Sequence, residues 1–234
     1  MLLAFDYDGT LAPIVTDPAK AVMRPRTRAL LDTLTERYPC VVISGRSQAD
    51  AKRLLRGIGL AEVIGNHGIE PWSISRRMAR ETDSWRPVLE KHFAAFPGVH
   101  VENKDYSLAV HYRRSRAKKK ARAEIRRVAT ALGRVRLIGG KQVVNILPPD
   151  APHKGMALER ERERLRCDTA IYVGDDTTDE DVFALDQPGQ LLTIRVGAKS
   201  SSAAVYYLRN QRDIDRLLQK LLDLRSAPLR TSLQ

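Results

Sequence analysis

The sequence predicts an α/β fold: a parallel sheet with helices on both faces, and a smaller α+β domain inserted into it. Short apolar runs alternate with helix-period segments at both ends of the chain, as parallel strands and crossover helices do. The middle of the chain instead shows strand-like runs of alternating polarity, which are typical of antiparallel hairpins. With 43% hydrophobic residues among 234, the chain can bury a sizeable core.

The first 72 residues alternate expected strands with expected helices. The strands are expected at residues 2–5, 40–43 and 63–64, and the helices at 26–37 and 48–55. Leu30, Leu31 and Leu34 recur at helical spacing, so they form the buried face of the first helix. Right-handed crossovers place the loops after parallel strands along one edge of the sheet, where open α/β sheets bind ligands.

Residues 73–150 are assigned to the inserted domain, because the pattern changes there. A helix is expected at residues 85–96, and strands are expected at 99–101, 107–112, 134–138 and 143–147. Between the second and third of these strands, apolar residues recur every three or four positions, which predicts an amphipathic helix. Those residues are Ala117, Ala121, Ile125, Val128 and Leu132. The proline-rich segment 148–152 leads out of the domain.

Residues 151–234 return to the first pattern. Helices are expected at 153–165 and 180–185, and strands at 170–173 and 191–196. A final helix is marked by its apolar positions Ile214, Leu217, Leu218, Leu221 and Leu222. Residues 1–72 and 151–234 are therefore expected to form one core domain, with a lid inserted between them.

The net charge of +12 suits anionic partners, which include both phosphorylated metabolites and nucleic acids. The densest basic cluster, from Arg113 to Arg127, falls on the predicted amphipathic helix and is interpreted as its solvated face. Single-stranded nucleic acid is bound through aromatic rings among the charges. No Phe, Trp or Tyr lies between Arg113 and Arg136, so nucleic-acid binding is disfavoured.

No targeting or membrane segment is evident in the sequence. No apolar stretch approaches the roughly 20 residues that span a bilayer. The apolar run from Met1 to Phe5 is interrupted at once by Asp6 and Asp8, unlike a signal peptide. The two cysteines lack the spacing of a metal site. A soluble cytoplasmic protein is expected.

Two carboxylates follow the first expected strand directly, in the segment Asp6-Tyr7-Asp8-Gly9-Thr10. A buried pair of like charges is costly unless a cation lies beside the carboxylates. Gly9 permits a sharp turn of the backbone, and Thr10 supplies a hydroxyl group near that turn. The segment is interpreted as part of a cation site rather than as a hydrated turn.

A second acidic segment follows the expected strand 170–173 and reads Gly174-Asp175-Asp176-Thr177-Thr178-Asp179-Glu180-Asp181. Its carboxylates repel one another unless a hard cation or hydrogen-bond donors compensate them. Part of the segment can also cap the short helix that follows. Because both acidic segments lie at the carboxyl ends of strands in one sheet, we expect them to form a Mg²⁺ site.

Two further segments suit a phosphoryl group. Ser44-Gly45-Arg46 follows the strand at 40–43 and offers a hydroxyl group and backbone amides to phosphoryl oxygens. Lys154-Gly155 opens a helix, so the ammonium group can lie beside the phosphoryl group as a point charge. Each segment is a weak signal by itself, and it is the combination with the two acidic segments that is informative.

These four segments, in this order and each at the end of a strand or helix, resemble the haloacid dehalogenase superfamily of phosphatases. The resemblance covers nearly the whole chain and implies a Rossmann-like catalytic core with an inserted cap that selects the substrate. It implies that Asp6 is the nucleophile, forming an aspartyl-phosphate, and that Asp8 is the general acid and base. It implies phosphoryl-binding roles for Thr10, Ser44, Gly45, Arg46 and Lys154, and Mg²⁺ binding by Asp6, Asp8 (through its backbone carbonyl), Asp175 and Asp179.

Finer details resemble the trehalose-6-phosphate phosphatases within that superfamily. The run from Asp6 to Ile14 matches their opening motif, and the run from Gly174 to Phe183 matches their last motif. Asn66-His67-Gly68 resembles their Ser-His-Gly segment. In the inserted domain the resemblance implies substrate-binding roles for Glu102, Lys104, Arg113, Lys141 and Asn145.

The chain departs from that family at Asn145. The family usually has a glutamate there, often within Glu-Val-Arg-Pro, whereas this chain reads Asn145-Ile146-Leu147-Pro148. Asparagine can still hydrogen-bond sugar hydroxyls, but without the strength that a carboxylate's charge adds. A related sugar phosphate or a glycosyl-phosphoglycerate therefore stays an alternative substrate.

The resemblance implies a Mg²⁺-dependent phosphoric monoester hydrolase that converts trehalose 6-phosphate to trehalose and phosphate. It also implies a functional link to a trehalose-6-phosphate synthase in trehalose biosynthesis. The alternative of another class is a non-catalytic protein that binds nucleic acid or another polyanion on the same scaffold. That alternative gives no reason for Asp6, Lys154 and Asp175 to occur together.

Overall fold

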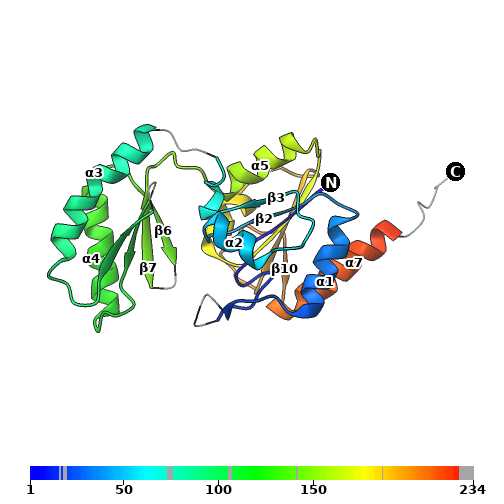
Figure 1. Cartoon of the computed structure of the whole chain (residues 1–234), viewed down its shortest axis with the longest axis horizontal. Helices are drawn as coiled ribbons and strands as arrows, with labels where there is room; N and C mark the ends of the chain where they lie inside the picture. The colour runs from blue at the N-terminus through cyan, green and yellow to red at the C-terminus, as the bar shows by residue number, and fades with distance from the viewer. Residues whose placement is uncertain are drawn as a thin grey trace. The chain divides into compact units, whose positions relative to one another are not determined.

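The computed structural model describes residues 1–15, 17, 20–72, 76–104, 107–140, 142–185 and 187–226 (Figure 1). The chain forms two compact units. One unit comprises Met1–Pro71 and Pro152–Gln234, and the other comprises Trp72–Ala151. Each unit has its own sheet and its own apolar core. Among the described residues, no helix is long and apolar enough to cross a membrane.

The first unit is built on a six-stranded sheet in which every neighbouring pair is parallel. Its strands stand in the order β10-β9-β8-β1-β2-β3. In chain order they are β1 (Leu2–Phe5), β2 (Cys40–Ile43), β3 (Glu62–Ile64), β8 (Ala170–Gly174), β9 (Leu191–Val196) and β10 (Tyr206–Leu208). The central strands β1 and β2 are fully buried, as the apolar runs predicted.

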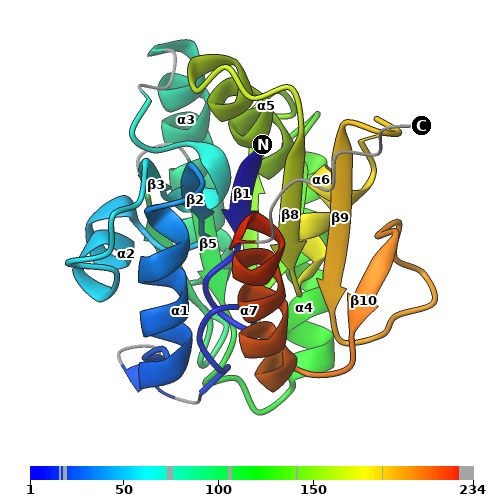
Figure 2. The ribbon, with the colours of Figure 1, turned by 90° about the vertical axis from the view of Figure 1, so that its right-hand side faces the viewer.

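Helices cover both faces of this sheet. Helices α1 (Pro25–Thr35) and α7 (Ile214–Ser226) lie together on the near face in Figure 2 and share one apolar cluster with Leu3 and Phe5 of β1. Helix α6 (Glu180–Phe183) lies behind the sheet in that view and packs against α5 (Lys154–Arg164). The short helix α2 (Gln48–Leu54) connects β2 to β3. The parallel sheet with helices on both faces confirms the predicted α/β class.

The second unit is an antiparallel sheet covered on one face by two helices. Its strand order is β4-β5-β7-β6, with bounds β4 (His100–Asn103), β5 (Leu108–His111), β6 (Arg136–Gly140) and β7 (Val143–Leu147). Helices α3 (Arg76–Phe93) and α4 (Lys118–Ala131) lie side by side in Figure 1. Their apolar faces form one core with strand residues such as Leu108 and Val110. The predicted hairpin, the basic amphipathic helix and the α+β character are confirmed.

Two elements differ from the sequence prediction. The helix expected at residues 85–96 is α3, which begins at Arg76 and ends at Phe93. Its first turns expose charged side chains, so the apolar repeat that marks a helix begins only near Trp85. Strand β10 was not predicted, because it is a short edge strand on which Tyr206 and Tyr207 are exposed, and only Leu208 packs against the core. Single turns of 3-10 helix occur at η2 (Asn66–Gly68), η3 (Thr177–Asp179) and η4 (Gln211–Asp213).

Candidate active site

The carboxyl ends of β1 and β8 bring the two acidic segments together. These strands are parallel neighbours, and Phe5 is paired with Val173. The amide of Asp6 donates to the carbonyl of Val173 at 2.8 Å, so the segments that follow the two strands start side by side. The Asp6 side chain is buried at this edge of the sheet. This arrangement is the one that the strand pattern predicted.

Lys154, the first residue of α5, joins the two acidic segments. Its side chain is buried, and its Nζ donates to Oδ1 of Asp6 and to Oδ1 of Asp179, each at 2.7 Å. Burial by itself would lower the pKa of Lys154, but the two carboxylates outweigh it and raise that pKa. Burial raises the pKa of Asp6 well above its usual value, against the attraction of Lys154 and with the repulsion of Asp179 and Asp175. One lysine therefore compensates two buried carboxylates.

Asp179 is the hydrogen-bonding centre of the second acidic segment. Its Oδ1 accepts hydrogen bonds from Lys154 and from the Tyr172 hydroxyl group, the latter at 2.6 Å. Its Oδ2 accepts from the amides of Asp175 and Asp176, each at 2.8 Å. Both oxygens of Asp179 are thus engaged, and the residue shapes the loop as well as orienting the lysine.

Asp6, Asp175 and Asp179 form a group that can hold a divalent cation. One carboxylate oxygen of each lies within 4.8 Å of the others. Oδ1 of Asp175 is buried and has no hydrogen-bond partner in the described part of the chain, and the same carboxylate lies where a Cβ on Gly9 would collide with it. Burial, with repulsion from Asp179 and Asp176, raises the pKa of Asp175 to about 7. A buried, under-compensated set of carboxylate oxygens fits Mg²⁺.

Asp8 is held by Arg46 through two parallel hydrogen bonds. Nε of Arg46 donates to Oδ2 of Asp8 at 2.6 Å, and Nη2 donates to Oδ1 at 2.7 Å. Nη1 donates to Oδ2 of Asp50 at 2.7 Å, and the guanidinium lies 5.5 Å from the centroid of the Tyr7 ring. The hydrogen bonds to Asp8 are the largest cause of a raised pKa of Arg46. Phosphate binding was the role predicted for Arg46, and the structure shows its guanidinium engaged with two carboxylates.

Thr10, Ser44 and Gly45, predicted to bind the phosphoryl group, follow the neighbouring strands β1 and β2. Both hydroxyl side chains are buried. Oγ1 of Thr10 has no hydrogen-bond partner among the residues that the structure describes, and Oγ of Ser44 accepts from the amide of Arg46 at 3.2 Å. A Cβ on Gly45 would collide with the His67 ring, so any larger residue there would have to displace that ring. A buried hydroxyl group without a protein partner suits an anionic ligand.

In the second unit, Glu102 and Asn145 lie in one row across the sheet. The register pairs Glu102 with Ala109, and Ala109 with Asn145. Residues paired in this way share a face, whereas the flanking Leu108 and Val110 pack into the core beneath the helices. Glu102 and Asn145 therefore lie on the face that α3 and α4 leave uncovered.

The further contacts of Glu102, and the positions of the other predicted substrate-binding residues of this unit, are as follows. Oε2 of Glu102 is hydrogen-bonded to Nε2 of His111 at 2.7 Å. Lys104 follows β4, and Arg113 follows β5 with an exposed side chain. Lys141 lies outside the described residues. The sugar-binding roles of these residues stay predictions.

Three contacts of the site were missed in the sequence. The Tyr172 hydroxyl group binds Asp179, as described above, and Nε2 of Gln211 donates to the carbonyl of Thr10 at 2.8 Å. Arg195 binds the backbone of the second acidic segment. A charged residue inside the apolar strand Leu191–Val196 was a usable signal for Arg195, whereas Tyr172 and Gln211 carry none.

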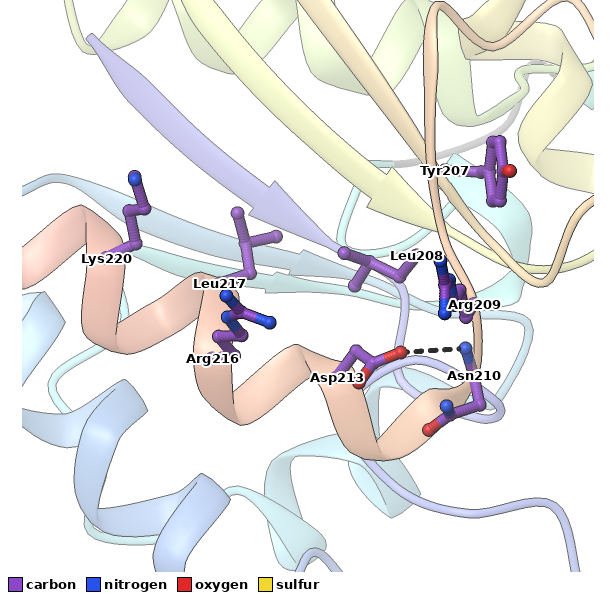
Figure 3. A pocket seen from close by; sticks show the side chains of 8 residues that line it. All are labelled: Tyr207, Leu208, Arg209, Asn210, Asp213, Arg216, Leu217 and Lys220. Carbon is purple, nitrogen blue, oxygen red and sulfur yellow. Dashed lines mark hydrogen bonds between the residues drawn. The ribbon is translucent and has the colours of Figure 1, made fainter.

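A separate groove of about 610 Å³ lies between β10 and α7 (Figure 3). Figure 3 shows its only acidic lining residue, Asp213, turned toward the amide of Asn210, which donates to it at 3.1 Å. The lining residues are Tyr207, Leu208, Arg209, Asn210, Asp213, Arg216, Leu217 and Lys220. None of them is a predicted site residue, so this groove is not where the carboxylates and the lysine meet.

The fold of the chain is that of haloacid dehalogenase-like hydrolases. A haloacid dehalogenase-like hydrolase from Bacteroides thetaiotaomicron has the same fold, with a TM-score of 0.69 at 15% identity, over 94% of this chain and 98% of that one. This likeness confirms the fold class that the sequence predicted.

The chain belongs to the trehalose-phosphatase family, a family of phosphoric monoester hydrolases. The family model matches residues 4–211. Trehalose 6-phosphate phosphatase RA3 from Zea mays is 31% identical over 259 residues, which is 97% of this chain and 71% of that protein. The C-terminal domain of the trehalose-6-phosphate phosphatase of C. albicans superposes with a TM-score of 0.75 at 25% identity, over 95% of this chain and 91% of that one. The family predicted from the motifs is confirmed.

Proposed function

We propose that the protein is a Mg²⁺-dependent trehalose-6-phosphate phosphatase that forms a phosphoryl-enzyme intermediate on Asp6. The observation that carries the proposal is the buried cluster in which Lys154 lies 2.7 Å from both Asp6 and Asp179, beside Asp175. Family membership supports the substrate, since the maize and C. albicans relatives are both named for trehalose 6-phosphate.

The chemistry follows from the positions of three side chains. A carboxylate oxygen of Asp6 attacks phosphorus, the bond between phosphorus and the sugar oxygen breaks, and Asp8 gives a proton to that oxygen. Water then attacks the phosphorus of the aspartyl-phosphate, Asp8 takes its proton, and phosphate leaves Asp6 free again. Lys154 compensates the charge that builds as two anions approach each other.

Mg²⁺ would be held by carboxylates of the two acidic segments. Asp6 and Asp175 would supply carboxylate oxygens, and Asp179 is the third carboxylate of the group. The backbone carbonyl of Asp8 is the further ligand that the resemblance implies. When bound, the cation supplies positive charge to the phosphoryl oxygens and to the buried carboxylates. Because Asp179 already accepts four hydrogen bonds, we propose that its main role is to orient Lys154 and the loop.

The second unit is proposed to act as the cap that recognises the sugar. Glu102 and Asn145 offer a carboxylate and an amide on one uncovered sheet face, which suits the hydroxyl groups of a glucose ring. Lys104, Arg113 and Lys141 are proposed to assist. With asparagine at position 145, the binding of trehalose relies on neutral hydrogen bonds at that point.

The protein is further proposed to act in the cytoplasm, beside a trehalose-6-phosphate synthase that supplies its substrate. Cys40 is a buried free thiol, as is usual in a reducing compartment. Release of the unphosphorylated sugar requires no membrane contact.

The substrate is tested by phosphate release with Mg²⁺ from trehalose 6-phosphate, sucrose 6-phosphate, glucose 6-phosphate and glycosyl-phosphoglycerates. We expect a preference for trehalose 6-phosphate by kcat/KM. Preference for another ester would keep the chemistry and replace the substrate. Release that does not depend on Asp6 would overturn the mechanism, and no release from any ester would favour a binding protein.

The Arg46→Lys variant is expected to lower turnover of sugar phosphates about 10-fold or more, because lysine cannot hold the Asp8 carboxylate with two parallel bonds. p-Nitrophenyl phosphate has a leaving group that needs no proton, so its single-turnover release of nitrophenolate should change little. The measurement is single-turnover kinetics on both substrates. Arg53→Lys is the matched control, since Arg53 binds Asp50 at 2.6 Å and, within the described part of the chain, forms no hydrogen bond with Asp8. Equal losses on both substrates, with a raised KM, would instead assign phosphate binding to Arg46.

The Glu102→Ala variant is expected to raise KM for trehalose 6-phosphate about 10-fold while leaving hydrolysis of p-nitrophenyl phosphate unchanged. Glu124→Ala is the matched control, because Glu124 is bonded to His92 at 2.8 Å much as Glu102 is to His111. Steady-state kinetics on both substrates decides the matter. If Glu102→Ala and Glu124→Ala behave alike, Glu102 lies outside the sugar site.

A further inference from the structure

We infer that Arg195 is a positioning residue that holds the second acidic segment in the shape that binds the cation, an inference that rests on the proposed function. Arg195 lies near the end of β9 and is paired with Gly174, the last residue of β8. The second acidic segment begins at the next residue, so the arginine side chain starts beside the segment that it would hold.

The guanidinium of Arg195 binds the backbone of that segment. Nη1 donates to the carbonyl of Asp176 at 3.2 Å, and Nη2 donates to the carbonyl of Asp175. Nη1 also donates to Oε1 of Glu180 at 2.9 Å. The second oxygen of Glu180 accepts from the amide of Ala203 at 3.0 Å, which ties the same assembly to the loop between β9 and β10.

The backbone of Asp175 is thereby held at both its amide and its carbonyl. Its amide is bound by Oδ2 of Asp179, and its carbonyl is bound by Arg195. Its carboxylate differs from its backbone, because Oδ1 is buried and has no hydrogen-bond partner within the described residues. The protein therefore binds the backbone of Asp175 at both its amide and its carbonyl, and leaves Oδ1 of the side chain for a ligand.

A lysine at this position could not replace the arginine. The planar guanidinium reaches two carbonyls and a carboxylate at once, whereas an ammonium group is a single point charge. Arg195 is only 8% exposed, so the free-energy cost of burying its charge has to be offset by these contacts. Removing it would leave two backbone carbonyls and Oε1 of Glu180 without this donor.

Whether Mg²⁺ affinity falls or rises when Arg195 is removed distinguishes a positioning role for this residue from a purely electrostatic one. Arg195 is a positive charge close to the proposed cation site, so by Coulomb's law its removal should strengthen cation binding. If Arg195 instead orients Asp175, its removal should weaken binding. Loss of an outer partner of a metal site lowers metal affinity by about 10–100-fold.

The test is Mg²⁺ binding to the full chain, measured by isothermal titration calorimetry for the parent, Arg195→Met and Arg195→Lys. We expect Kd to rise about 10-fold or more in Arg195→Met, and by less in Arg195→Lys, which keeps the positive charge. Arg195→Lys also serves if the methionine variant does not fold. Thermal unfolding with and without Mg²⁺ gives a second readout, in which Mg²⁺ should raise the Tm of the parent more than that of either variant.

Arg162→Met is the matched control. Arg162 is also 8% exposed, binds Glu159 at 3.1 Å and the carbonyl of Asp168 at 2.6 Å, and touches none of the acidic segments in the described structure. It should lose stability and keep its Mg²⁺ affinity. An Arg195→Met variant that binds Mg²⁺ as tightly as the parent, or more tightly, would reduce Arg195 to a structural residue.

The failure of this inference can be told from failure of the proposed function. Asp175→Asn should weaken Mg²⁺ binding, and an unchanged affinity would overturn the inference, because there would be no ligand for Arg195 to orient. Mg²⁺ binding that depends on Arg195 in a protein that hydrolyses none of the sugar phosphates would instead keep the inference and reject the proposed function.

Discussion

Replacing Asp6 with asparagine is expected to lower phosphate release by about 10⁴-fold or more while leaving the fold intact. Asparagine cannot form the covalent phosphoryl intermediate, and the loss of a covalent nucleophile has effects on this scale. Mg²⁺ and trehalose 6-phosphate should still bind, because Lys154 and Asp175 remain. The measurement is phosphate release under saturating substrate, with Asp32→Asn on the exposed face of α1 as control.

The stability of this variant follows from the pKa of Asp6. Burial and neighbouring carboxylates raise the pKa of Asp6 in the fold above its value in the unfolded chain. The ionised side chain therefore destabilises the metal-free fold, and this loss of stability sets in as pH rises through the unfolded-state pKa. Asparagine removes that cost, while Lys154 keeps Asp179 as a partner. We expect an unchanged or higher Tm at neutral pH, and a large fall in Tm would show that lost activity reports unfolding.

The order of elements and the identity of the catalytic loops could be predicted because they depend on local patterns. Asp6 and Asp175 each follow a strand that is apolar throughout, and parallel strands place their following loops at one edge. The lysine at the start of α5 was predicted on its position alone. These inferences need only the register of neighbouring strands, which the apolar pattern supplies.

The contacts between side chains could not be predicted, because they depend on how the packed elements meet. Nothing in the sequence Ser44-Gly45-Arg46 indicates that the arginine binds the Asp8 carboxylate rather than a phosphate group. The hydroxyl group of Tyr172 binds Asp179 in the site, although Tyr172 lies in a strand whose sequence predicts only a buried core strand. Likewise, an exposed edge strand such as β10 leaves no trace in the apolar pattern.

Replacing Lys154 with methionine is expected to lower the free energy of unfolding of the metal-free protein by about 3–5 kcal/mol. Breaking a buried ion pair on one side leaves charge in the interior without compensation, and here both Asp6 and Asp179 lose their cation. Added Mg²⁺ should restore part of the loss, because a bound cation compensates the same carboxylates. Phosphate release should fall by about 10²-fold or more. Denaturant unfolding measures the stability, and Lys52→Met, which breaks an exposed pair with Glu62, should cost less than about 1 kcal/mol.

The partner of Lys154 can then be identified by adding Asp6→Asn to Lys154→Met. In the parent, asparagine at position 6 removes a costly carboxylate but also a partner of the lysine, so the net change is small. In the Lys154→Met background the same substitution removes only an uncompensated charge, so it should raise stability. Residues in direct contact couple by about 0.5–3 kcal/mol in such a cycle. If the two changes simply add, the contact between Lys154 and Asp6 does not stabilise the fold, and Asp179 alone holds the lysine in place.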